Sequence, residues 1–92
     1  MSKARFLLTT FALLPLAVIA GDDVPLDELP EVVVKAIKTE YPDAKLLEAE
    51  LEKEGEVTFY EVDVVHQGIK MAVDVSPEGK VLAIDEEVKR VK

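Results

Sequence analysis

Apolar residues recur along this chain with three different spacings, and each spacing predicts a different kind of segment. Residues 6–17 form an almost unbroken apolar run behind Lys3 and Arg5. Between residues 29 and 41, apolar residues return every four positions, as they do on one face of a helix. From residue 47 onward, apolar and charged residues alternate with a period of two, which is typical of strands that bury one face.

The helix is expected to begin at Pro30 and to end before Pro42. Proline is favoured at the first helical position, and the carboxylate of Glu31 would stabilise the first turn through the helix dipole. The residue before a proline avoids the helical region, so Pro42 marks the end. The stripe that should face the core contains Leu29, Val33, Ile37 and Tyr41.

Four strands are expected after the helix, because residues 47–52, 60–64, 69–75 and 81–85 alternate and are separated by short turns. Short turns imply antiparallel neighbours in chain order. The predicted fold class is therefore α+β, with one N-terminal helix packed on a four-stranded antiparallel meander sheet in two layers. The predicted core consists of Val33, Ile37, Tyr41, Leu47, Leu51, Tyr60, Val62, Val64, Met71, Val73, Leu82 and Ile84.

Residues 1–20 have the features of a cleaved secretory signal peptide. A short cationic start precedes the apolar run, and Val18-Ile19-Ala20 places small residues before Gly21. The run is too short to cross a bilayer with ordinary flanks, so cleavage rather than anchoring is expected. The remaining chain would comprise a flexible acidic arm at 21–28, a folded domain at 29–88 and a charged tail at 89–92. These features predict a periplasmic or secreted protein that leaves the membrane after cleavage.

The chain is acidic, and this limits its partners. Its formal net charge is −8, and removal of Lys3 and Arg5 with the signal segment would make it −10. Such a charge argues against nucleic acid and anionic lipid as partners and favours a basic protein surface or cations. The chain has no cysteine, so no disulfide can stabilise it in an oxidising compartment.

Several short motifs occur in an order that resembles the PepSY-like domain family, which includes the repeats of the β-lactamase-inhibitor protein. They are Leu29-Pro30, Ala36, Tyr41-Pro42-Asp43-Ala44, Tyr60-Glu61-Val62 and the stretch from Val73 through Pro77-Glu78-Gly79-Lys80 to Leu82. The resemblance covers about residues 28–88. It implies a helix on a curved antiparallel sheet, an exported protein, and a non-enzymatic role in binding or inhibiting another protein, such as a peptidase. This chain carries one repeat, whereas the β-lactamase inhibitor carries two.

Candidate catalytic chemistry is sparse. His66 is the only histidine, and its place beside a turn is typical of a partly exposed structural residue. A soft metal would need further histidine or cysteine ligands, and no nucleophile–base combination stands out in the sequence. We therefore expect no enzyme activity, no catalytic residue, no cofactor and no dedicated metal site.

The alternation places a set of charged residues on the strand face that points away from the helix. Three interpretations apply to it: a solvated face, a surface for a partner protein, and a weak Ca²⁺ site built on the sheet. The predicted partner-binding residues are Glu48, Glu50, Phe59, Glu61, Asp63, Val65, Lys70 and Asp74.

The function hypothesis is a small exported interaction or inhibitory module of PepSY-like type that binds a protein through this acidic sheet face. The alternative is a small acidic periplasmic protein that binds cations or acts in stress. The partner would be a basic protein or a peptidase, and the chain itself would be a monomer or a weak homodimer.

Overall fold

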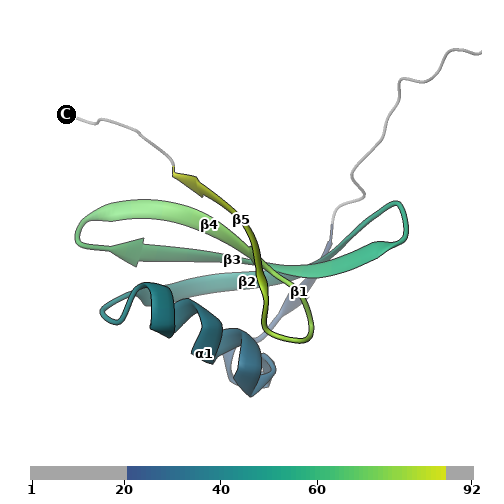
Figure 1. Ribbon diagram of the computed structural model, residues 1–92, viewed down its shortest axis with the longest axis horizontal. Coiled ribbons are helices and arrows are strands. Elements are labelled where there is room, and N and C mark those ends of the chain that lie inside the picture. Colours follow the sequence, from purple (N-terminus) through teal and green to yellow (C-terminus); the bar gives the residue numbers. More distant parts are fainter. Residues whose placement is uncertain (1–20, 87–92) are drawn as a thin grey trace, which may run out of the picture.

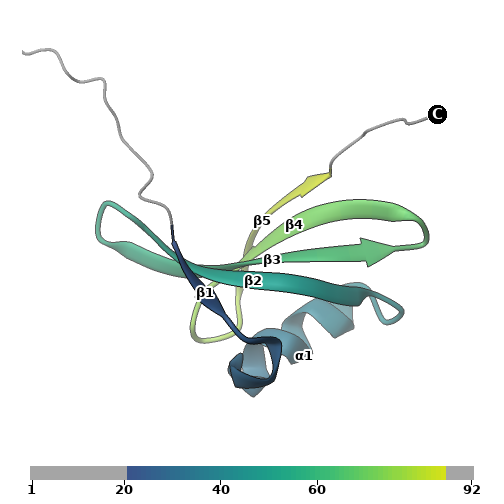
Figure 2. The same cartoon turned by 180° about the vertical axis from the view of Figure 1, so that it is seen from behind.

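The computed structural model describes residues 21–86, which form one helix on one face of a five-stranded antiparallel sheet (Figures 1 and 2). The strands follow chain order across the sheet, from β1 to β5. Their bounds are β1 Asp22–Val24, β2 Lys45–Glu54, β3 Val57–His66, β4 Ile69–Val75 and β5 Val81–Glu86. Between β1 and β2 lie the 3-10 helix η2, Leu26–Glu28, and the helix α1, Glu31–Glu40.

The two-layer α+β class is confirmed, but the expected number of strands and the position of the helix are wrong. The additional strand is β1, which pairs antiparallel with β2 and precedes α1. It lies inside the segment 21–28 that was predicted as an arm, and η2 occupies the last three residues of that segment. The predicted signal segment 1–20 and the predicted tail 89–92 lie outside the described residues.

The ends of α1 follow the two prolines. Pro30 directly precedes the helix, and its carbonyl oxygen accepts hydrogen bonds from the backbone N–H groups of Val33 and Val34 at 3.0 and 3.3 Å. At the other end, the N–H of Tyr41 donates to the carbonyl of Ile37 at 2.8 Å. Tyr41 itself has left the helical region, with φ −134° and ψ 82°, as expected for a residue before proline.

Tight turns set the register of the sheet. Gln67 and Gly68 both have positive φ angles, as a two-residue hairpin of the type I′ kind requires, so the predicted turn at this point is confirmed. The predicted turn Ser76-Pro77-Glu78-Gly79 is also confirmed, because the N–H of Gly79 donates to the carbonyl of Ser76 at 2.9 Å. The hydroxyl of Ser76 accepts a further bond from the N–H of Lys80 at 3.0 Å.

The core lies between α1 and the inner face of the sheet. Its buried members are Leu29, Val33, Ile37, Ala44, Ala49, Val62, Val64, Met71, Val73 and Val75. Tyr41 and Tyr60 are half-buried and pack against this cluster, so their hydroxyls can reach water. Leu51 is half-buried as well.

Three predicted core residues are exposed instead: Leu47 at 40%, Leu82 at 46% and Ile84 at 39%. A register shift between Leu46 and Glu48 makes Leu47 the extra residue of a bulge in β2. A second shift leaves Leu82 unpaired, since Val81 lies opposite Val75 and Ala83 lies opposite Asp74. Bulges of this kind change the strand phase locally, which alternation alone does not reveal. Ile84 keeps the inner phase opposite buried Val73, but it lies on the edge strand.

Candidate functional site: an acidic sheet face

The strand register places charged residues on the sheet face opposite α1. β2, β3 and β4 alternate, so residues buried beneath α1 are followed by residues on the other side. No described element of residues 21–86 covers this outer face (Figures 1 and 2). We call it the acidic face and define it by its carboxylates, which are Asp23, Glu48, Glu50, Glu52, Glu54, Glu61, Asp63, Asp74 and Asp85.

Four of these carboxylates form a row straight across the sheet. Asp23 lies opposite Glu50, Glu50 lies opposite Glu61, and Glu61 lies opposite Asp74, so the row crosses β1 to β4. Directly opposed side chains have Cβ atoms about 4.5–5.5 Å apart, and like charges at that spacing destabilise a sheet. We call these residues the carboxylate row. Its central members belong to interior strands, so protection of a sheet edge does not explain them.

A second group of acids flanks the carboxylate row. Glu48 lies opposite Asp63, which lies opposite Ala72, and Ala72 lies opposite Asp85. Glu48, Glu50, Glu61 and Asp63 line a shallow depression of about 100 Å³. Glu61 and Asp63 also border a larger depression of about 200 Å³ that reaches Lys70, Ala72 and Asp85.

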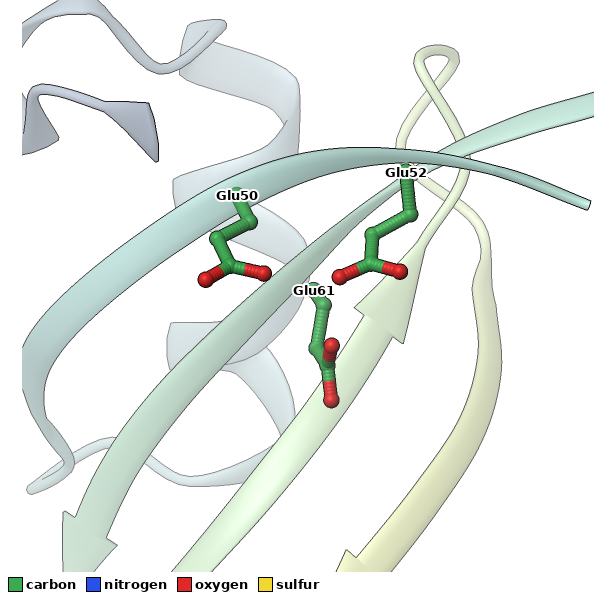
Figure 3. Close-up of side chains that lie close together, drawn as sticks. All are labelled: Glu50, Glu52 and Glu61. Atoms are coloured by element: carbon green, nitrogen blue, oxygen red, sulfur yellow. The ribbon is translucent and has the colours of Figure 1, made fainter. Parts of the chain in front are cut away.

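Three glutamates come closest together at the centre of the face. Figure 3 shows Glu50 and Glu52 projecting from β2 and Glu61 from β3, all on the side of the sheet away from α1. Carboxylate oxygens of these three residues lie within 4.8 Å of one another. Oxygen ligands suit a hard cation such as Ca²⁺, so this is where the described residues could share one. Exposed acidic groups nevertheless converge commonly without a metal.

Three carboxylates of the acidic face have raised pKa values, through hydrogen bonding or burial first and through neighbouring charge second. A hydrogen bond with Glu52 favours the protonated form of Glu50 and raises its pKa, with smaller contributions from burial and from the charges of Glu52, Asp23 and Asp63. Burial is the largest cause of the raised pKa of Glu61, and the same hydrogen-bonding residue, Glu52, acts in the opposite direction there. Burial also raises the pKa of Asp74, followed by the charges of Glu52, Glu54 and Asp85.

These shifts predict that the fold becomes more stable as the pH falls from 7 toward the ordinary carboxyl pKa of about 4. A carboxyl group whose pKa is higher in the folded state binds more protons there than in the unfolded chain. Stability should therefore decline as the pH rises from the unfolded pKa of about 4 through the raised folded values. Urea unfolding at pH 5 and pH 7 measures this slope. The variant Glu50→Gln, Glu61→Gln, Asp74→Asn should flatten it, and an unchanged slope in that variant would assign the effect to other groups.

All the residues predicted for the partner-binding face lie on the outer side of the sheet. Glu48, Glu50, Glu61, Asp63 and Asp74 belong to the two acidic groups described above. Phe59 lies opposite Glu52 and is half-buried, as is Val65. Val65 lies opposite both Lys45 and Lys70, so two lysines flank it at one end of the face.

Of the carboxylates of the acidic face, the predicted list lacked Asp23, Glu52, Glu54 and Asp85. Glu52 and Glu54 continue the alternation of Glu48 and Glu50 in the sequence. Asp85 could have been found, because it alternates with Ile84 in the last predicted strand. Asp23 carried no such signal, since a three-residue strand is too short for a period to be recognised.

His66 lies at the end of β3 and is half-buried, away from the acidic face. Its ring packs against Tyr41, with ring centroids 4.9 Å apart and planes inclined by 53°. Its Nδ1 atom is buried and has no hydrogen-bond partner among the described residues. The packing of its ring against Tyr41 favours the structural interpretation of His66.

Comparison with family models shows which family the chain belongs to. The model of the family described as "Putative beta-lactamase-inhibitor-like, PepSY-like" matches residues 18–83. The chain belongs to the PepSY-like family. The resemblance predicted from the Tyr41-Pro42 and Pro77-Glu78-Gly79 motifs is thereby confirmed. The family's description is that of an inhibitor-like module rather than a catalyst.

No curated protein and no solved structure matches this PepSY-like chain significantly. Among residues 21–86, no helix has the length and apolar character needed to cross a membrane.

Proposed function

We propose that this PepSY-like domain is a non-catalytic binding module whose acidic face holds a basic surface of another protein. The observation that carries the proposal is the carboxylate row, in which Asp23, Glu50, Glu61 and Asp74 oppose one another across four strands. Such a row weakens the sheet when nothing neutralises it. Departures from local stability rules are expected at functional sites, where a ligand compensates for them.

Cationic side chains of a partner would neutralise this charge on binding. Complementary charge accelerates association and selects the partner, and its effect weakens as salt screens it. Phe59 and Val65 supply apolar contact area beside the acids, which suits the mixed character of protein interfaces. An inhibitory role would follow if the basic surface surrounds the active site of an enzyme, in keeping with the inhibitor-like description of the family.

The proposal is tested first with peptides of defined charge. Binding of the purified protein to heptalysine and to heptaglutamate is measured at 20, 150 and 500 mM NaCl. We expect heptalysine to bind at low salt, to weaken steeply as salt rises, and heptaglutamate not to bind. Immobilised protein would then capture partners from the exported fraction, with elution by salt. Tight Ca²⁺ binding without any peptide binding would instead favour the alternative, a protein that binds cations by its acids.

Phe59→Ala should separate binding from stability. Phe59 is half-buried on the acidic face, so its truncation should change the free energy of unfolding by no more than about 1 kcal/mol. Binding of the captured partner should weaken about tenfold, the effect of a modest apolar anchor. The neighbouring Tyr60 packs against the core, and Tyr60→Ala should cost about 2 kcal/mol of stability. Unfolding by Phe59→Ala with binding retained would contradict the proposed surface.

We also propose that the module acts outside the cytoplasm. The sequence of residues 1–20 supports this, because Lys3, Arg5 and the apolar run have the order of a signal peptide. Every described element lies after Ala20, so cleavage there would leave the sheet and helix intact. Mass spectrometry of the exported protein should show Gly21 as the first residue. An intact Met1 on the exported form would contradict cleavage.

A further inference from the structure

The two edges of the sheet differ in how they resist further strand pairing. β1 has only three residues, presents exposed Asp22 and Asp23, and is followed by Pro25. These are the features that natural proteins use to block an edge. β5 is longer, with six residues, Val81–Glu86, and contains neither proline nor lysine; its two charged residues, Asp85 and Glu86, are exposed acids that a basic segment can pair with. After the bulge at Leu82, residues Ala83 to Glu86 pair in regular register with β4.

Within residues 21–86, β5 pairs with β4 alone and no described strand lies beyond it (Figure 1). Its backbone N–H and C=O groups on that side are thus available for another strand. Leu82 and Ile84 leave 46% and 39% of their surface exposed beside this edge. Together these features make β5 a template for an added extended segment.

The two faces of β5 specify different side chains on such a segment. Ile84 lies opposite Val73 and therefore faces the helix side of the sheet. Asp85 lies opposite Ala72, and Ala83 lies opposite Asp74, so both face the acidic side. Side chains of an added strand would alternate in the same way and meet these neighbours about 4.5–5.5 Å away. The complementary segment alternates apolar residues toward Ile84 with cationic residues toward Asp85 and Asp74.

Charge distinguishes between the candidate occupants of this edge. A second copy of the chain would join two acidic faces side by side, and each copy carries a net charge of −8. The resulting repulsion disfavours self-association. A basic segment would instead bring its cationic side chains next to Asp85, which belongs to the edge strand itself, and would neutralise this carboxylate together with the rest of the acidic face.

We infer that β5 accepts an extended segment of the basic partner as an additional strand, with its cationic side chains over the acidic face and its apolar ones beside Ile84. This inference rests on the proposed function, because it takes the same basic partner. It adds directional backbone pairing to a contact that charge alone would leave unspecific. Main-chain hydrogen bonds then provide affinity, and the alternation of side chains provides sequence preference.

Peptides N-methylated on alternate residues test the inference. The probe is a heptapeptide of alternating lysine and valine with lysine at both ends. Two methylated forms carry N-methyl groups either on all valine amides or on all internal lysine amides. A strand pairs through one of its edges, whose N–H groups belong to alternate residues. One methylated form should therefore lose affinity at least tenfold while the other keeps most of it. Amide NMR signals of Ala83 to Glu86 should shift with the binding form only.

A matched pair of protein variants completes the test. Ile84→Lys places a cation beside the proposed strand, whereas Leu47→Lys places one at the β2 bulge, at a residue of nearly equal exposure. Binding of the unmethylated probe should fall about tenfold for Ile84→Lys and stay unchanged for Leu47→Lys, with the fold of each checked by circular dichroism.

The possible outcomes separate the two proposals. Equal binding by both methylated forms, together with equal binding by the two variants, overturns strand addition and leaves the acidic face in place. Failure of the probe and of heptalysine to bind at low salt overturns both. Sedimentation as a dimer without peptide, abolished by Ile84→Lys, would show that a second copy occupies the edge and would also overturn the inference.

Discussion

Ile37→Ala should destabilise the domain by about 2–5 kcal/mol, the usual effect of truncating a fully buried isoleucine. The side chain of Ile37 is 0% exposed and packs in the core between α1 and the sheet. α1 is the only α-helix among residues 21–86, so loss of this contact weakens the whole second layer. For a domain of this size each kcal/mol shifts the melting temperature by about 4–8 °C. A small domain has a limited margin of stability, so the variant should be partly unfolded near body temperature.

Ile84→Ala is the matched control for that measurement. Ile84 has the same side chain and faces the same layer, but 39% of it is exposed on the edge strand. Its truncation should cost about 1 kcal/mol or less. Thermal and urea unfolding followed by circular dichroism measure both variants. Equal losses would mean that the helix covers β5 as fully as it covers β3 and β4, contrary to the observed burial.

The difference between these two isoleucines shows what alternation can predict. In the central strands the period of two assigned the correct face to Val62, Val64, Met71 and Val73, all of which are buried. The period also placed Ile84 on the correct face. It could not show how far the helix reaches across the sheet, because that depends on the position of α1 over the sheet. Burial at an edge strand is a tertiary property.

Bulges limited the prediction in a second way. Leu47 and Leu82 continue the alternation of their strands in the sequence, but each is exposed at a point where the register shifts. An extra residue in one strand leaves no mark in the pattern of apolar and polar residues on its own. The strand β1 was missed for a related reason, since Asp22-Asp23-Val24 has too few residues for alternation to be distinguished from a charged loop.

The sequence predicts which acids share the outer face of the sheet, but it does not predict which of them lie opposite one another. Alternation places Glu48, Glu50 and Glu52 together on one side of β2, and Glu61 and Asp63 on the same side of β3. Which carboxylate lies opposite which depends on the register, which the hairpin turns at Gly55 and at Gln67-Gly68 set. The bulge at Leu47 changes only the pairs beyond it, Leu46 with Val64 and Lys45 with Val65. The carboxylate row therefore emerges only in the folded sheet, although all its members but one lie in strands that were expected from the sequence.

Neutralising the carboxylate row should have opposite effects on stability and on binding. In the variant Glu50→Gln, Glu61→Gln, Asp74→Asn, three repelling charges on adjacent strands are removed. The free energy of unfolding at pH 7 should rise by about 1 kcal/mol, because directly opposed like charges destabilise a sheet by a few tenths to 1 kcal/mol for each pair. Affinity for heptalysine at 20 mM NaCl should fall about three- to a hundredfold, since each of the three exposed charge pairs that are lost contributes about 0.2–1 kcal/mol.

The matched control removes three carboxylates from exposed positions off the sheet, in the variant Asp27→Asn, Glu31→Gln, Glu40→Gln. Its net charge changes equally, so any effect of overall charge on peptide binding appears in both variants. We expect it to bind heptalysine within about threefold of the unmodified protein, because these residues lie in η2 and α1 rather than on the acidic face. Equal loss of binding in both variants would show that heptalysine binding depends on the net charge of the protein and not on the position of the carboxylates on the acidic face. Loss confined to the row variant, together with its gain in stability, would identify the opposed carboxylates as a surface that is maintained for a partner at the expense of the sheet that carries it.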